Sequence, residues 1–202
     1  MSYLRQMCEM LVPEYSIETI KYFTAPVSGK EELDKPIRQQ TYLRALRTIG
    51  CEIIPGKFMT REAYMRLAPD PTQTVTISKI EGETANSHRV DDQHPTVLVL
   101  KTEEKGSDVN LASHLLINGF EKRYEAAIVL TNDSDLTMPI RYVRENLGFE
   151  IVVINPDRNV TSKSLAKAAS TVRQLRAGVL EACQFTDVVY YPKGMIKKPD
   201  GW

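Results

Sequence analysis

The chain has 202 residues, of which 42% are hydrophobic and 26% charged, a composition typical of a globular domain with a core of its own. Its 26 basic and 26 acidic side chains balance, which excludes a whole-molecule attraction to nucleic acid or membranes and confines any polyanion site to a local patch. No apolar run reaches the roughly 18 residues of a membrane span, and the first residues lack the apolar core of a signal peptide.

The first half of the chain predicts helices that alternate with strands. Apolar residues recur at helical spacing over residues 4–11. A second helix is predicted after Asp34, a favoured N-cap residue, with Pro36 in its first turn and Gly50 at its end. Strands are predicted over residues 17–23, 51–61 (interrupted at Pro55-Gly56), 74–80 and 96–101, the last two as a hairpin around a long polar loop.

The second half continues the alternation. Helices are predicted over residues 106–120, 135–148 and 162–180, and strands over residues 126–131, 150–155 and 185–192. AAIVLT is a continuous apolar run of the kind found in buried parallel strands, and EIVVIN is predicted to be another buried strand. We therefore predict one α/β domain over residues 1–202 around a mainly parallel sheet, with a hairpin insertion near residues 61–100 and a basic C-terminal tail.

The cysteines indicate the cellular setting. Cys8, Cys51 and Cys183 are odd in number and far apart, and no C-x-x-C spacing is present. This pattern predicts neither a disulfide framework nor a zinc ribbon. We expect a reducing, cytoplasmic location.

Acidic residues follow one of the apolar strands directly. Asp133 and Asp135 come after AAIVLT and precede a predicted helix, and Asp108 lies at the start of the preceding helix. In open α/β sheets, ligands bind outside the carboxyl ends of the strands. If the strand over residues 96–101 belongs to the same sheet, the three carboxylates converge at one edge. Carboxylate oxygens and water are the ligands that Mg²⁺ prefers, and such an ion supports phosphodiester hydrolysis.

Two other interpretations of these acids stay open at this point. Asp and Ser are favoured N-caps, and a carboxylate at a helix N-terminus gains roughly 0.3–1 kcal/mol from the helix dipole. That accounts for one residue among Asp133, Ser134 and Asp135, and for Asp108 it is the stronger alternative. A D-x-D pattern after a strand also occurs in glycosyltransferases that hold a metal and a nucleotide-sugar diphosphate.

Other polar side chains are candidates either for ligands or for solvated surface. His88, Asp91, Asp92 and His94 stand close together in a polar, aperiodic segment without packed residues to support a site, so we interpret them as a solvated loop. His114 is expected to be a partly buried helix residue. Lys105, Arg141 and Arg144 are the candidates for phosphate contacts, whereas the remaining basic residues are expected mostly to be solvated: Lys163, Lys167, Arg173, Arg176, Lys193, Lys197 and Lys198.

Two segments in this order carry a family resemblance. KTEEKGSDVNLASHLL (residues 101–116) and YEAAIVLTNDSDLTMPIRYVRENLGFEIVVINP (residues 124–156) resemble the NYN family of PIN-like nucleases, whose members have a KG-x-D-V helix start and an S-x-D-S-D-L/F turn there. IKYFTA, RQQTYLRAL and ACQF are similar to the bacterial branch of that family. The resemblance covers nearly the whole chain and is weakest over residues 61–95.

The resemblance implies a fold, an activity and a set of site residues. The fold would be a PIN-like α/β/α sandwich, and the activity that of an Mg²⁺- or Mn²⁺-dependent ribonuclease in which metal-activated water attacks the phosphorus of RNA. Asp108, Asp133 and Asp135 match the acidic metal-site positions. Asn132 and Ser134 lie within the second motif as groups that would orient the ligands. Lys105 and Arg141 are the candidates for substrate contacts.

The chain departs from the family pattern at its start. Family members usually begin with a strand that ends in a D-G-x-N turn, whose aspartate is a further metal ligand, and that strand is central to the sheet. This chain opens in the helix that should follow, and Glu9 and Glu14 lie on or just after that helix. We expect the sequence to be truncated at its start, because all later segments match. The alternative is a catalytically impaired RNA-binding or regulatory module with the same fold. An incomplete sheet would also offer a strand edge for pairing in a homodimer.

Overall fold

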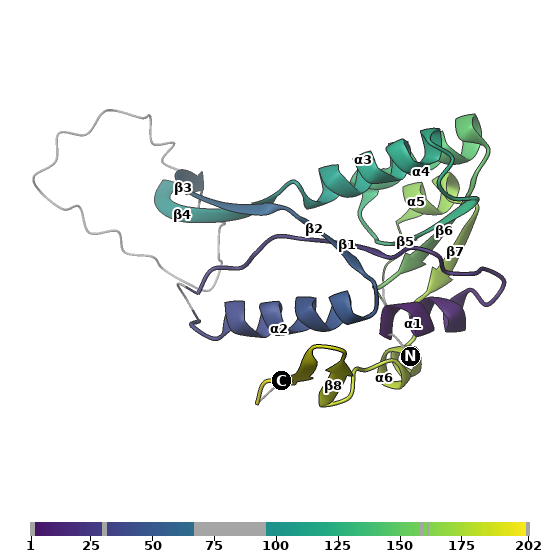
Figure 1. The fold of residues 1–202 in the computed structure, drawn as a ribbon. Coiled ribbons are helices and arrows are strands. Elements are labelled where there is room, and N and C mark those ends of the chain that lie inside the picture. The colour runs from purple at the N-terminus through teal and green to yellow at the C-terminus, as the bar shows by residue number, and fades with distance from the viewer. Residues whose placement is uncertain (1–2, 30–31, 67–95, 158–159, 161, 201–202) are drawn as a thin grey trace, which may run out of the picture. The chain divides into compact units, whose positions relative to one another are not determined.

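The computed structural model describes residues 3–29, 32–66, 96–157, 160 and 162–200, and Figure 1 shows their secondary structure. The chain forms two compact units, one made of Met1–Phe58 and Glu104–Trp202 and the other of Met59–Glu103. Within the described residues, no helix has both the length and the apolar character needed to cross a bilayer.

Helices and strands alternate along most of the described chain. The helices are α1 (Tyr3–Leu11), α2 (Lys35–Thr48), α3 (Ser107–Phe120), α4 (Thr137–Tyr142), α5 (Lys163–Ala168) and α6 (Ala177–Ala182), with a 3₁₀ turn η1 (Ser134–Leu136) before α4 and a π turn η2 (Val143–Leu147) after it. The strands are β1 (Lys21–Thr24), β2 (Glu52–Pro55), β3 (Lys57–Arg66), β4 (Thr96–Lys105), β5 (Ala126–Leu130), β6 (Glu150–Asn155), β7 (Thr171–Gln174), β8 (Val188–Tyr191) and β9 (Gly194–Lys197).

Five strands of the first unit are parallel. β5, β6 and β7 form one sheet in that order, in which Val153 pairs with Val129 on one side and with Val172 on the other. β1 and β2 form a second parallel sheet, in which Tyr22 pairs with Ile53. The predicted mixed α/β fold with parallel strands is thus confirmed, although its parallel strands lie in two sheets.

Side chains from β5 and β6 alternate between two helical layers. Val129 and Val153 pack with residues of α3, α4 and α5, among them Leu115, Ile140 and Leu165. On the opposite face, Ile128 and Ile154 pack against α1 and the α6 segment through side chains that include Met7, Leu11, Val179 and Cys183. Both faces are covered, which explains why both strands are apolar from Ala126 to Leu130 and from Ile151 to Ile154.

The β1–β2 sheet lies between the same two layers. Tyr22 packs with Leu43 and Leu46 of α2 and with Leu4 of α1, and Leu4 also belongs to the cluster beneath β6. The next residue, Phe23, points to the other face, where its ring lies 5.5 Å from that of His114 on α3. α1 and α3 therefore each contact residues of both parallel sheets.

The second unit contains the paired strands β3 and β4, which are mostly exposed. Thr60 and Thr102 share a hydrogen bond of 2.9 Å between their hydroxyls, and Arg61 forms an ion pair with Glu103 at 3.6 Å. The prediction paired residues 96–101 with residues 74–80, but β3 is the partner that the structure shows. Residues 74–80 lie outside the described part of the chain.

One predicted helix was wrong in part. Residues 162–180 form α5, the strand β7 and α6 instead of one continuous helix. Ser162 caps α5, but Ala169 is extended (φ −73°, ψ 158°), and Ser170 then bonds the start of β6 through its amide and its hydroxyl. The following β-branched residues, Thr171 and Val172, gain more by pairing with a buried strand than by continuing a helix.

The C-terminal segment contains regular secondary structure. β8 and β9 form an antiparallel hairpin in which Val189 pairs with Ile196, and Ile196 is buried. The strand expected near residues 185–192 is therefore confirmed as β8, while β9 was missed because its sequence, GMIK, has a glycine and a lysine at its ends.

Candidate functional site

The turn after β5 is organised by its own polar side chains. The buried hydroxyl of Thr131 accepts a hydrogen bond from the amide of Asp133 at 3.0 Å. The carboxylate of Asp133 in turn accepts one from the amide of Asp135 at 2.9 Å, so Asp133 is the N-cap of η1. Leu136, only 2% exposed, anchors the turn in the core. The turn holds Asp133 half-buried and Asp135 exposed at the carboxyl end of β5.

The first turn of α3 sits against the end of β2. Asn110 donates a hydrogen bond to the carbonyl of Pro55 at 3.3 Å, which ties α3 to the last residue of that strand. A Cβ on Gly56 would lie 2.6 Å from Ser107 Oγ and 2.9 Å from the carbonyl oxygen of Lys105. Only glycine allows this approach, and Gly106 (φ +96°) supplies the left-handed turn into the helix. Asp108 is thereby placed at the carboxyl end of a parallel strand.

The carboxylates of the two turns lie within electrostatic reach of each other. The pKa of Asp108 is raised from its usual value by partial burial first, and then by the negative charges of Asp133, Glu104 and Asp135. The predicted convergence of Asp108 with Asp133 and Asp135 is consistent with this shift. The predicted convergence depended on the strand over residues 96–101 lying in the same sheet as β5. That condition is not met, because β4 pairs with β3 and not with the β5 sheet.

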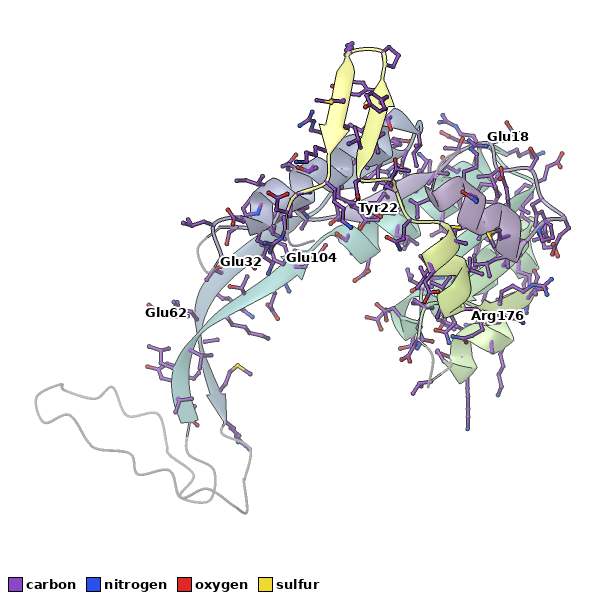
Figure 2. The ribbon with its side chains drawn as sticks, turned by 90° about the horizontal axis from the view of Figure 1, so that it is seen from below. Glu18, Tyr22, Glu32, Glu62, Glu104 and Arg176 are labelled. Carbon is purple, nitrogen blue, oxygen red and sulfur yellow. The ribbon has the colours of Figure 1, made fainter. Side chains whose placement is uncertain are left out.

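Glu104 is an acidic residue of this region that the sequence analysis did not single out. It stands at the end of β4, where the strand leads into α3 (Figure 2), and its carboxylate accepts a hydrogen bond from Ser107. The signal was present in the sequence, since the segment TEEKGSD places two glutamates just before the helix start.

Asn132 has a definite structural role. Its side chain donates to the carbonyl of Val160 at 3.1 Å and accepts from the amide of Ser162 at 2.9 Å. Asn155, 1% exposed at the end of β6, donates to the same carbonyl at 2.9 Å. These bonds fix the segment after β6 beside the turn after β5. A direct role of Asn132 in orienting the carboxylates stays a prediction.

The other predicted polar residues take different positions. Ser134 contributes its carbonyl, which accepts from the hydroxyl of Thr137 at 2.6 Å. Arg141 is exposed on α4, and its guanidinium donates to the sulfur of Met138 at 2.7 Å. Arg144 donates at 2.8 Å to the carbonyls of both Lys167 and Ala169, so it closes the end of α5.

Histidines do not join the acidic residues in the described part of the chain. His114 is partly buried, as predicted, between Phe23 and Lys21, whose ammonium lies 3.3 Å from its Nδ1. Lys21 also forms an ion pair with Glu52 at 2.8 Å, which is the first cause of the lowered pKa of Glu52. The group from His88 to His94 lies outside the described residues.

The carboxylate oxygens of Asp133 and Asp135 are ligands that suit a hard divalent cation, although they do not form a complete coordination site. Among the described residues, no three His, Cys, Asp or Glu side chains are grouped closely enough to hold a metal ion. Mg²⁺ keeps several waters and is commonly held by one or two carboxylates. Asp133 and Asp135 supply carboxylates of that kind, and a cation beside them would offset the repulsion that raises the pKa of Asp108.

Comparisons with known proteins cover most of the chain. The NYN domain model matches residues 31–176. The chain is 26% identical over 193 residues to 6-hydroxy-3-succinoylpyridine 3-monooxygenase of Pseudomonas putida (strain DSM 28022 / S16), which covers 91% of this chain and 57% of that protein. It thus spans little more than half of that relative. A crystal structure of a protein of unknown function from Vibrio parahaemolyticus RIMD 2210633 covers 87% of this chain and 79% of its own, with 14% identity and a TM-score of 0.49.

Proposed function

The chain belongs to the NYN domain family, and from this membership we propose that it is a metal-dependent ribonuclease that hydrolyses RNA phosphodiester bonds. The observation that carries the proposal is the family match over residues 31–176, and the turn that places Asp133 and Asp135 at the carboxyl end of β5 supports it. Acids that repel one another at the carboxyl ends of parallel strands are costly for folding alone, and they suit a site completed by a cation.

In this proposal the acids hold Mg²⁺ or Mn²⁺ and the chain positions the RNA around it. Asp133, Asp135 and Asp108 are the residues that would hold the ion, in part through water. A bound ion of this kind lowers the pKa of water and stabilises the charge that develops on phosphate oxygens. Thr131 and the Asp133 cap keep the carboxylates in place, and Lys105 and Arg141 are the proposed contacts for RNA phosphates.

We also propose that a further parallel strand joins the two sheets of the first unit. β5 pairs with β6 alone and β1 pairs with β2 alone among the described strands. α3 and α1 nevertheless contact residues of both sheets, one helix on each face. A strand between β1 and β5 would complete the PIN-like sheet and could bring the remaining metal ligand of the family to the same edge.

Cleavage of single-stranded RNA in the presence of Mn²⁺ tests the nuclease proposal. The chain, and a longer natural form if the gene encodes one, should cleave RNA with Mn²⁺ and stop when EDTA is added. The double variant Asp133→Asn/Asp135→Asn should lose cleavage, whereas Glu181→Gln on α6, which packs against α1, serves as a matched control. Cleavage that survives the double variant would contradict the proposal.

A second candidate function rests on the Pseudomonas relative, whose name describes a monooxygenase. If this chain shares that chemistry, it should consume O₂ when 6-hydroxy-3-succinoylpyridine and a reductant are supplied. The nuclease proposal expects no such consumption. A non-catalytic RNA-binding module, in contrast, would bind RNA and show neither activity.

A further inference from the structure

An apolar groove lies between α3 and α4, which run side by side in Figure 1. Its volume is about 300 Å³, and it is lined by apolar and aromatic side chains: Ala112, Leu116, Phe120, Met138, Pro139 and Tyr142. Phe120 and Met138 are each 59% exposed, so the groove opens to solvent. The rings of Phe120 and Tyr142 lie 5.9 Å apart at an angle of 48°. Aromatic faces exposed in this way are available for stacking.

The groove begins close to the proposed metal site. Ala112 follows Asp108 by four residues on α3, and Met138 follows Asp135 by three residues at the start of α4. One helical turn rises about 5.4 Å, so both walls of the groove start about one turn from the acidic residues. A molecule held at the carboxylates can therefore extend into the groove.

A cation stands at the rim of the groove. The exposed guanidinium of Arg141 contacts the sulfur of Met138, which is itself part of the lining. The groove thus has three features that match the parts of a nucleotide chain. These are acidic residues at one end, two aromatic rings in the lining, and a guanidinium at the rim. The carboxylates would hold the metal at one phosphate, the rings would take a base, and Arg141 would meet a neighbouring phosphate.

On the basis of the proposed function, we propose that this groove is a subsite for an unpaired base of single-stranded RNA. A base in a duplex cannot enter it, because its faces are stacked within the helix. Since every base has a π-face and the lining consists of apolar and aromatic side chains, the subsite tolerates any base. Six lining residues suit a small planar group, whereas a stable protein interface uses roughly 20–30 residues on each side.

Binding measured without divalent metal tests the subsite separately from catalysis. A short single-stranded RNA that contains one fluorescent base analogue is titrated into the protein in EDTA. Stacking in the groove should change the fluorescence of the analogue, and the matching RNA duplex should bind more weakly. Tyr142→Ala and Phe120→Ala should each weaken binding by roughly 5- to 150-fold, the range expected for loss of one stacked base.

Matched variants and the oligomeric state complete the test. Tyr142→Phe should bind as the wild type does, because it keeps the ring, and Ile117→Ala should also leave binding unchanged, because Ile117 is exposed on α3 but does not line the groove. Wild-type RNA affinity in both alanine variants would overturn the subsite, as would a dimer in sedimentation that those variants dissociate. If RNA stacks in the groove but is never cleaved with Mn²⁺, the nuclease proposal is contradicted while the subsite is supported.

Discussion

The carboxylate of Asp133 accepts a hydrogen bond from the main-chain amide of Asp135 at 2.9 Å, so the first acid of the turn fixes the position of the second. A cap and a metal ligand were competing interpretations of this turn. The cap is present, and it uses one oxygen of Asp133 while the other remains for a ligand. The two roles are therefore compatible in one side chain.

Substitutions of Asp133 should separate these roles. Asp133→Asn retains an oxygen that can accept from the Asp135 amide, so we expect its free energy of unfolding to stay within about 0.5 kcal/mol of the wild type. Asp133→Ala removes the cap and should lower that free energy by about 1 kcal/mol. Both should abolish Mn²⁺-dependent cleavage. Equal stability of the Ala and Asn variants in urea denaturation would show that the cap contributes nothing.

Gly56 should be intolerant of any side chain. Gly56→Ala would place its Cβ 2.6 Å from Ser107 Oγ and 2.9 Å from a backbone carbonyl, and we expect a loss of about 1–3 kcal/mol in the free energy of unfolding. Gly178→Ala in α6 is the matched control, since a Cβ there meets no atom within 4 Å and should stabilise the helix by about 0.5–1 kcal/mol. A neutral effect of Gly56→Ala would contradict the close approach of α3 to β2.

The raised pKa of Asp108 gives stability a defined pH dependence. A carboxyl whose pKa is higher in the folded state binds its proton more tightly there, so its contribution is fully present at pH values below the unfolded pKa and is lost as the pH rises through the folded pKa. Asp108→Asn removes the charge, and we expect it to be more stable than the wild type at neutral pH. The difference should vanish in acid, near the ordinary carboxyl pKa of 3.8 and below. Urea denaturation of both proteins between pH 3 and 7 measures it, and a difference that is independent of pH would refute the explanation.

Divalent metal should stabilise the fold through the same acids. We expect Mn²⁺ at ten times its dissociation constant to add roughly 1.4 kcal/mol to the free energy of unfolding of the wild type, which appears as a higher Tm. The double variant Asp133→Asn/Asp135→Asn should show no shift beyond that caused by Mn²⁺ on a control such as Glu181→Gln. A shift of equal size in all three proteins would place the bound metal elsewhere.

The cysteines should resist alkylation in the folded protein. Burial is the first cause of the raised pKa of each thiol, which reaches about 11 for Cys8 and for Cys51 and is also above its usual value for Cys183. At pH 8 the thiols are therefore protonated and shielded, and reaction with iodoacetamide should be slow until urea is added. Fast modification of any one cysteine, located by peptide mass spectrometry, would show that its environment opens in the native state.

Sequence patterns predicted the parts of the fold that depend on local periodicity and burial. β5 and β6 were found because both of their faces are covered, which gives each strand an unbroken run of apolar residues. β7 was missed because Leu165, Ala168, Val172 and Leu175 keep helical spacing, while the pairing of Val172 with Val153 is a tertiary contact that no local pattern reveals. The acids Asp133 and Asp135 were recognised by their place after a strand. The contact that positions Asp108 could not be recognised in this way, because it joins Asn110 to Pro55, which are 55 residues apart in sequence.

Arg144 links α5 to the helical segment that forms one wall of the groove. One nitrogen of its guanidinium holds the carbonyls of Lys167 and Ala169, so the turn that continues α4 is fastened to the end of α5. α4 also carries Met138, Pro139 and Tyr142, which form one wall of the groove. Widening the groove by moving α4 therefore has to carry α5 along or break both bonds. Both bonds oppose a movement of α4 away from α5, so the wall of the groove that α4 forms is held in place before RNA arrives.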